Sequence, residues 1–196
     1  MTADARPLYG LVLAGGQSRR MGRDKALLSH DGETQLDRAM SALAEFTERQ
    51  FVSARADQAD DPERARYPQV VDRYDDMGPV AGILSAMDEY PGADWLVVAC
   101  DLPNLDRDTL GHLVENRLAD DPFTAFRSTH DGLPEPLCAI YASGSERVVR
   151  AFVDDGVICP RKMLIRAEAA LLEQPNPRAL DNVNTPEDLE ASILEA

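Results

Sequence analysis

The feature that most constrains this chain is a short apolar run that leads directly into a glycine-rich, basic loop. The run, Leu8–Leu13, predicts a buried strand. Two adjacent glycines, Gly15 and Gly16, follow it, and glycines let bare backbone N–H groups approach a ligand and form a concave anion site. The loop also holds four cationic side chains, Arg19, Arg20, Arg23 and Lys25. Together these residues predict a phosphate-rich ligand, most simply a nucleotide.

Two common phosphate-binding loops do not fit this segment. The P-loop requires Gly, four residues and then Gly-Lys-Ser/Thr, whereas five residues separate Gly16 from Gly22 and an arginine follows. The dinucleotide fingerprint G-x-G-x-x-G fails because Gly15 and Gly16 are adjacent. The alternative is a basic surface turn between a strand and a helix, but four cations beside a double glycine favour the ligand-binding interpretation.

Composition narrows the class of protein. A chain of 196 residues is within the usual size of one domain, about 100–200 residues, and 44% hydrophobic residues suffice for a core. No apolar run approaches the ~20 residues of a membrane span, and residues 1–7 lack the apolar segment of a signal peptide, so we expect a cytoplasmic protein. The net charge of −15 argues against nucleic acid or an anionic membrane as partner. We expect a monomer or a weak oligomer.

The three cysteines, Cys100, Cys138 and Cys159, lie far apart in the sequence, and the histidines are scattered. This spacing argues against a structural zinc site or a disulfide framework. We therefore expect all three cysteines to be small buried packing residues.

Strands and helices alternate through the first part of the chain. Strands are predicted at 8–13, 50–54, 69–72 and 95–100, and helices are predicted around 36–43, from Pro79, and after Pro103 as far as Leu118; residues 57–67 are ambiguous, with a weak helix as one option. The near-continuous apolar run 95–100 is typical of a parallel sheet covered on both faces. The alternation predicts βαβ units and a mostly parallel sheet.

The pattern changes after residue 122. Residues 123–127 and 136–141 predict an antiparallel strand pair, and Ser143 with Glu146 predicts a capping box before a helix. A short helix over 160–167, a strand over 170–173 and a last helix capped by Thr185 follow. The fold class predicted is α/β: a single domain, 1–196, with a mostly parallel sheet and an antiparallel part in its C-terminal half.

Two aspartates, Asp72 and Asp101, lie at the ends of predicted strands. In an open α/β sheet, ligands bind at the carboxyl ends of the strands, so the glycine loop, Asp72 and Asp101 are expected to meet at one edge. A carboxylate there needs a cationic partner, and Mg²⁺ held by carboxylates and substrate phosphates is a simple one. The alternatives are that Asp101 caps a turn and that Asp72 belongs to a solvated acidic loop.

The motif L-A-G-G-x-S-x-R-M-G-x-D-K, from Leu13 to Lys25, resembles the signature loop of the molybdenum cofactor guanylyltransferases. Further matches are the C-D-x-P segment that contains Asp101, the G-P-V-A-G segment 78–82 (the family has leucine for Val80), the Glu135-Pro-Leu segment and the C-terminal N-x-N-T-P-E-D motif. The resemblance thus spans most of the chain. It implies a three-layer α/β/α, Rossmann-like fold of the glycosyltransferase-A type, with a nucleotide half at about 8–120 and an acceptor half at about 121–196.

The resemblance also implies a reaction and its residues. The terminal phosphate of molybdopterin, or of its molybdenum-loaded form, attacks the α-phosphorus of GTP and pyrophosphate leaves. It implies Arg20, Lys25 and Asp101 as catalytic residues, Asp101 as the Mg²⁺ ligand, and Asn182 and Asn184 as contacts to the acceptor, although Asn184 or Thr185 would also be expected as a helix cap. The implied nucleotide-binding residues are Leu13, Ala14, Gly15, Gly16, Lys25, Asp72 and Asp101.

Two features bear on which nucleotide is used and on the alternatives. CTP-using relatives tend to carry L-A-A-G where this chain has Leu13–Gly16, and they lack the segment at 79–82, so the resemblance implies GTP. The alternatives are a nucleotidyltransferase with CTP or another phosphorylated acceptor, and a non-catalytic nucleotide-binding adaptor that works with molybdoenzyme-maturation proteins. This chain also departs from the family at Ser53, where an asparagine is expected nearby, and the roles of Arg161 and Lys162 stay open.

Overall fold

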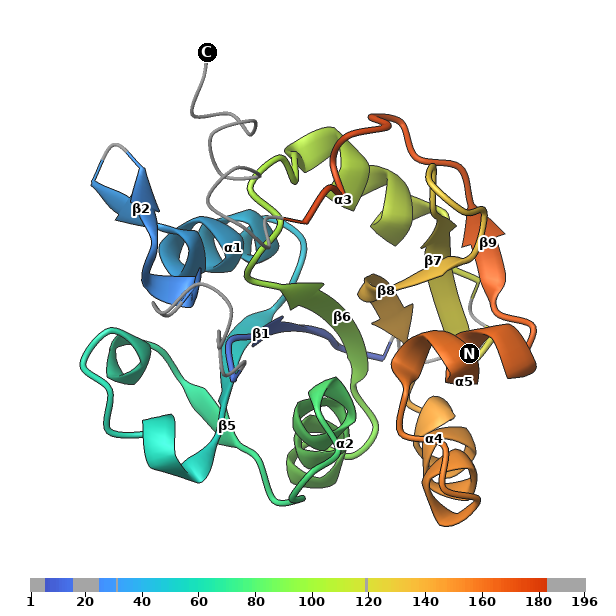
Figure 1. The fold of residues 1–196 in the computed structure, drawn as a ribbon. Helices are drawn as coiled ribbons and strands as arrows, with labels where there is room; N and C mark the ends of the chain where they lie inside the picture. Colours follow the sequence, from blue (N-terminus) through green and yellow to red (C-terminus); the bar gives the residue numbers. More distant parts are fainter. Residues whose placement is uncertain (1–5, 16–24, 31, 119, 183–196) are drawn as a thin grey trace.

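The computed structural model describes residues 6–15, 25–30, 32–118 and 120–182 of the 196. Within this part of the chain, seven strands form one sheet in the order β5-β4-β1-β6-β8-β7-β9 (Figure 1). Their bounds are β1 (Leu8–Leu13), β4 (Arg49–Ala54), β5 (Gln69–Val71), β6 (Asp94–Ala99), β7 (Phe123–Arg127), β8 (Pro134–Tyr141) and β9 (Ala170–Leu172). Only β8 runs antiparallel to its sheet neighbours. The predicted mostly parallel sheet with an antiparallel part in the C-terminal half is confirmed.

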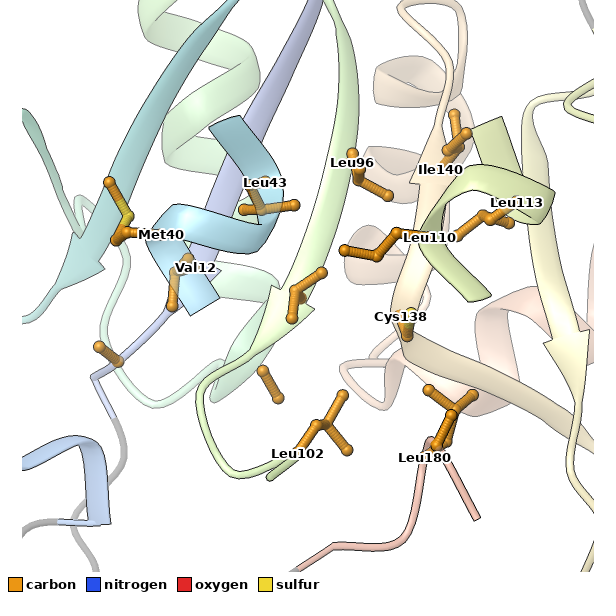
Figure 2. Close-up of a cluster of buried hydrophobic side chains, with 14 of the residues drawn as sticks. Val12, Met40, Leu43, Leu96, Leu102, Leu110, Leu113, Cys138, Ile140 and Leu180 are labelled. Carbon is orange, nitrogen blue, oxygen red and sulfur yellow. The ribbon is translucent and has the colours of Figure 1, made fainter. Parts of the chain in front are cut away.

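Helices cover both faces of this sheet, which gives the three-layer arrangement that the resemblance implied. Their bounds are α1 (Gln35–Ala44), α2 (Pro79–Glu89), α3 (Arg107–Glu115), α4 (Ser145–Asp154) and α5 (Pro160–Arg166). Helices α1 and α3 lie on one face, where Leu43, Leu96 and Leu110 share a core (Figures 1 and 2). Helices α2, α4 and α5 lie on the other face around a second core that contains Trp95 and Leu164.

Local sequence signals explain where the first elements begin. All six residues of β6 are buried, as expected for a strand covered on both faces. A small hairpin, β2 (Ser29–His30) and β3 (Glu33–Thr34), leads into α1, whose N-cap Thr34 forms a capping box with Asp37. Helix α2 begins at Pro79, where the missing N–H costs nothing.

The option of a weak helix over residues 57–67 is wrong. The segment forms two separate 3₁₀ turns, η2 (Ala56–Gln58) and η3 (Arg64–Arg66). Pro62 lies between them; it lacks an N–H and disfavours helical geometry in the residue before it. The Asp61 side chain then accepts the N–H groups of Glu63 and Arg64 at 3.1 Å each, so a side chain supplies what a helix backbone would have supplied.

Two predicted helix ends are also wrong. Helix α3 stops at Glu115, because the Asn116 side chain donates to the His112 carbonyl at 2.8 Å, and Leu118 therefore lies beyond the helix and is exposed. The capping box at Ser143 does not form. The N–H of Ser143 donates instead to the Asp94 carboxylate at 2.9 Å, and α4 begins two residues later with Gly144 as its N-cap.

Among the cysteines, only Cys138 is buried as expected, while Cys100 is half-buried and Cys159 is exposed. The last helix, predicted from Thr185, lies outside the described residues. In the part of the chain that the structure covers, none of the helices is long and apolar enough to span a membrane.

Candidate active site

The topology of the sheet decides which residues can meet. Because every strand except β8 runs the same way, the carboxyl ends of β1, β4, β5, β6, β7 and β9 lie along one edge. The start of β8 lies at the same edge, since β8 pairs antiparallel with β6. Strand β1 lies between β4 and β6, with Leu13 aligned with both Ser53 and Ala99. The glycine loop therefore leaves the sheet between the two segments that follow β4 and β6.

Backbone and side-chain donors hold the beginning of this loop. The N–H of Ala14 donates to the Ser53 carbonyl at 3.2 Å. The Ala14 carbonyl accepts from Arg64, whose Nη2 lies 2.8 Å away and whose Nε lies 3.3 Å away. The next carbonyl, that of Gly15, accepts from Arg55 Nη1 at 2.7 Å. The backbone of the first two loop residues is thus held by Ser53 in β4 and by two arginines that follow β4 in the sequence.

Asp72 lies beside the same loop, one residue after the end of β5. Its N–H donates to the Ala54 carbonyl at 2.9 Å, and its Oδ1 accepts from the buried Ser53 hydroxyl at 2.9 Å. A Cβ added at Gly15 would come 3.5 Å from Asp72 Oδ2, so this carboxylate faces the loop backbone. Burial raises the pKa of Asp72, and the Ser53 hydrogen bond and the nearby Arg55 charge offset part of that rise. Asp72 belongs to the loop's surroundings, and the solvated-loop alternative is wrong.

Asp101 follows the neighbouring strand β6. The N–H of Cys100 donates to the Leu13 carbonyl at 3.4 Å, which joins the residue before Asp101 to the residue before the loop. Asp101 itself is half-buried, and the next residue, Leu102, packs in the core. The expectation that the loop, Asp72 and Asp101 lie at one edge is confirmed for the described part of the loop.

The segment before the C-terminal motif returns to this edge. Ala179 and Leu180 are buried in the core that contains Leu102, and Figure 2 shows Leu180 close to Leu102 and Cys138. Asn182 is exposed two residues further on. Nearby, His130 Nε2 lies 2.9 Å from Asp181 Oδ1, which links this segment to the turn between β7 and β8.

Arg161 is more than a helix surface residue. From the first turn of α5 it donates to Glu135 on β8 and to Asp131 in the turn before β8, at 2.9 Å each. Glu135 precedes Cys138, which pairs with Val98, so it lies where β8 extends past the end of β6. Arg161 thus connects α5 to the start of β8 and to the turn before it, at the same edge of the sheet.

Some of the predicted site residues lie outside the described part of the chain. These are Gly16, Arg20 and Asn184. For Lys25 the structure places the backbone, at the start of the 3₁₀ turn η1 (Lys25–Leu27). The predicted roles of these four residues stay predictions.

The donor set at the edge fits a magnesium ion. Mg²⁺ prefers oxygen ligands and is usually held by one or two carboxylates together with substrate phosphates. Asp72 supplies a carboxylate beside Gly15, and Asp101 follows Cys100, whose N–H donates to the carbonyl of Leu13 just before the loop. Among the described residues no group of three or more His, Cys, Asp or Glu side chains is arranged to hold a metal by itself.

Sequence reasoning missed three side chains that build this site. Ser53 orients Asp72, and Arg55 and Arg64 hold the two loop carbonyls. The departure at Ser53 thus corresponds to a carboxylate-orienting hydroxyl. Arg64 lies in a polar stretch without periodicity, so no pattern in the sequence distinguishes it from the exposed Arg66 two residues later.

A mostly parallel α/β/α sheet with the start of a glycine loop and two acids at its carboxyl edge is the arrangement of a nucleotide-binding α/β protein. The model of the MobA-like NTP transferase domain matches residues 10–171, and the chain belongs to this family. The resemblance found in the sequence is thereby confirmed.

Individual relatives agree with this assignment. The chain is 36% identical over 202 residues to a protein of Opitutus terrae named "Probable molybdenum cofactor guanylyltransferase", with 96% of each chain covered. It is 37% identical over 182 residues to a "Molybdenum cofactor biosynthesis bifunctional protein" of Synechocystis, and the match covers 93% of this chain but 52% of that protein. Its fold is similar to the crystal structure of molybdopterin-guanine dinucleotide biosynthesis protein A from Archaeoglobus fulgidus, with a TM-score of 0.74, 24% identity, and 93% and 95% of the two chains covered.

Proposed function

We propose that this protein transfers GMP from GTP to the terminal phosphate of molybdopterin or the molybdenum cofactor, giving the guanine dinucleotide cofactor and pyrophosphate. The observation that supports the proposal most is the meeting of the loop start, Asp72 and Asp101 at the carboxyl edge of a MobA-like domain. The names of the full-length relatives support GMP transfer. The cytoplasmic location and the use by molybdoenzyme-maturation proteins expected from the sequence belong to the same proposal.

The reaction requires no side-chain nucleophile, because the acceptor phosphate is already anionic. The protein's task is then to position two anions and to neutralise the charge that develops on pyrophosphate. The backbone N–H groups of Gly15 and Gly16, with Arg20 and Lys25, would hold the triphosphate. Asn182 and Asn184 would contact the acceptor, and the burial of Leu180 beside Leu102 supports that placement for the segment.

Asp101, with Asp72 beside the loop, would hold Mg²⁺. When bound, the ion supplies charge neutralisation at the phosphate oxygens. Asp72 has a second task in this proposal: it presents a carboxylate that Ser53 holds at 2.9 Å, which limits where the nucleotide can lie against Gly15.

A pyrophosphate-release assay tests the proposal. The full chain is incubated with Mg²⁺ and molybdopterin and with GTP, CTP, ATP or UTP in turn, and the expected result is release with GTP above the other three. A preference for CTP would overturn the nucleotide assignment, and release that needs a different phosphorylated acceptor would overturn the acceptor. Nucleotide binding without release under any of these conditions would favour the non-catalytic adaptor. Removal of Mg²⁺ with EDTA is expected to stop the reaction.

A further inference from the structure

Two arginines from outside the glycine loop donate hydrogen bonds to its first two carbonyl groups. Arg64, in η3, directs Nη2 and Nε at the Ala14 carbonyl, at 2.8 and 3.3 Å. Arg55, just after β4, directs Nη1 at the Gly15 carbonyl, at 2.7 Å. The two donors are 50 and 40 residues away from their acceptors in the sequence, so only the fold brings them together.

The burial of Arg64 is unusual for a charged side chain. It is 1% exposed, and taking a guanidinium out of water is costly unless hydrogen bonds and charges compensate it. Asp61 provides a charge 3.4 Å from Arg64 Nη1, and the same carboxylate accepts the Arg64 backbone N–H. A lysine could balance Asp61 as well, but it could not present two fixed donors to one carbonyl.

A carboxylate lies close to each of the two guanidinium groups and offsets much of its charge. Asp57 accepts from Arg55 Nε and Nη2 at 2.9 and 2.7 Å, which orients the guanidinium while its Nη1 points to Gly15. Asp61 lies near the Arg64 guanidinium in the same way, with its Oδ1 at a longer distance of 3.4 Å from Nη1. The pair therefore acts mainly through geometry and only secondarily through its charge.

The geometry has a direct consequence for the loop. In a trans peptide the C=O of one residue and the N–H of the next point in opposite directions within one rigid plane. Arg64 fixes the Ala14 carbonyl, so it also fixes the N–H of Gly15 on the opposite side, away from η3. An N–H that is held in place before the ligand arrives needs no reorganisation when it binds an anion.

We propose that Arg64, supported by Arg55, is a positioning residue for nucleotide binding: it sets the peptide plane between Ala14 and Gly15 so that the Gly15 N–H faces the phosphates. This inference rests on the proposed function for the identity of the ligand. The orientation of the loop peptide does not depend on that identity.

Arg64→Lys is the central variant, and Arg66→Lys is its matched control. Arg66 lies in the same 3₁₀ turn, but its side chain is 52% exposed and pairs with Glu63 and Asp37. Arg64→Lys keeps the positive charge but cannot donate two fixed hydrogen bonds to the Ala14 carbonyl. The value of kcat/KM for GTP is therefore expected to fall about tenfold to a hundredfold, the scale of a charge-assisted hydrogen bond. Arg66→Lys is expected to stay within about twofold, because exposed ion pairs contribute little.

A second measurement separates positioning from folding. Amide hydrogen exchange of a peptide that contains Ala14 and Gly15 is expected to become faster in Arg64→Lys and to stay unchanged in Arg66→Lys. Peptides from β6 and α2 report whether the fold is intact, and their exchange is expected to match that of the wild type. Equal kcat/KM and equal exchange of the Gly15 amide in Arg64→Lys and the wild type would overturn the proposal.

Two further outcomes are informative. If Arg64→Lys does not fold, Arg55→Lys tests the same idea, because Arg55 is partly exposed and holds the adjacent carbonyl; unchanged exchange at Gly15 in that variant counts against the proposal. If the wild type releases no pyrophosphate from any nucleotide, the proposed function fails. The exchange measurement still decides whether Arg64 sets the loop peptide.

Discussion

The proposed nucleotide side and the proposed acceptor side of the sheet edge are held together by different kinds of contact. On the nucleotide side, which comprises the loop start and the segments after β4 and β5, Ser53 and Arg64 are 3% and 1% exposed and bond to Asp72 and Ala14. On the acceptor side, which comprises the β7–β8 turn, the start of α5 and residues 176–182, partly exposed ion pairs such as those of Arg161 and His130 link the separate segments.

This difference indicates how each side works. Buried hydrogen bonds fix one geometry, because an unmade bond leaves a desolvated group behind. Exposed ion pairs contribute ~0–1 kcal/mol each and exchange readily with water. The nucleotide side is therefore expected to be preorganised, whereas the acceptor side is expected to adjust its surface when the acceptor binds.

The largest effect is expected at Asp101. Asp101→Ala is expected to lower the rate of pyrophosphate release on the order of 10³-fold or more, because several kcal/mol of charge stabilisation by a metal ion are lost. The circular dichroism spectrum and melting temperature should stay close to those of the wild type. An acceptor-side counterpart, Asp131→Ala, should lose less than about tenfold, because the ion pair with Arg161 and the hydrogen bond from the Leu133 N–H that it removes are both exposed. Turnover of Asp101→Ala near the wild-type level would remove Asp101 from the mechanism.

Gly82→Ala tests how closely the nucleotide side is packed. A Cβ at this position would lie 2.1 Å from Ser53 Oγ and 3.0 Å from Ser53 Cβ. We expect the free energy of unfolding to fall by about 1–3 kcal/mol, the usual cost of overpacking, as measured by urea denaturation. Adding Ser53→Ala should recover part of the loss, because the clashing hydroxyl is gone.

Gly15→Ala is the matched control for that experiment. Its Cβ would meet Arg55 Cγ and Asp72 Oδ2 at 3.5 Å, an ordinary contact distance, so stability should change by less than about 0.5 kcal/mol. Its affinity for GTP should nevertheless fall, since the added methyl group lies against Asp72, whose carboxylate is proposed to limit where the nucleotide lies. A large loss of stability in Gly15→Ala would contradict this distinction between the two glycines.

Arg161→Ala tests how much the ion pairs of the acceptor side contribute to stability. The variant removes the partly exposed ion pairs with Glu135 and Asp131, each 2.9 Å long, and is expected to lower the free energy of unfolding by about 1 kcal/mol or less. The difference from the wild type should shrink when the salt concentration rises from 0.05 to about 0.5 M, because exposed charges are screened. A loss above about 2 kcal/mol that salt does not reduce would show that this side is as firmly built as the nucleotide side.

The smallest expected effect has the opposite sign. Burial raises the pKa of Asp72 above its ordinary value of 3.8, so between 3.8 and the folded-state pKa the folded protein binds more protons than the unfolded chain. The free energy of unfolding therefore decreases as pH rises through this interval, and the cost is fully present above the folded-state pKa. Asp72→Asn keeps an acceptor for Ser53 and removes this cost.

We expect Asp72→Asn to be more stable than the wild type at pH 7 by less than about 1 kcal/mol. The advantage should decrease as pH falls toward 3.8. Thermal unfolding in EDTA-containing buffers from pH 4 to pH 8 measures it. A variant that is less stable than the wild type at pH 7 would show that Asp72 contributes to the fold as an ion. The comparison therefore shows whether the ionised Asp72 carboxylate beside Gly15 lowers the stability of the folded protein.

Much of the fold could be predicted because it depends on local patterns. The apolar runs of β1 and β6, the helical spacing in α1 and the proline that opens α2 each identify an element without knowledge of its neighbours. Strand ends in a parallel sheet share one edge, so Asp72 and Asp101 could be placed together from the order of elements alone. The predictions failed where a side chain took over a backbone group, either from the same segment, as Asn116 does at the end of α3, or from elsewhere in the fold, as Asp94 does at Ser143.

The sequence by itself determined the layered α/β plan, the glycine loop after β1 and the two acids that follow β5 and β6. The tertiary structure alone decided which arginines hold that loop and which hydroxyl orients Asp72. Arg64 and Arg66 are two residues apart and chemically identical, yet one is buried against Ala14 and the other lies in solvent. The physical reason is that the contribution of a charged side chain depends on partners brought to it by the fold, and for Arg64 the loop carbonyl of Ala14 is 50 residues away in the chain.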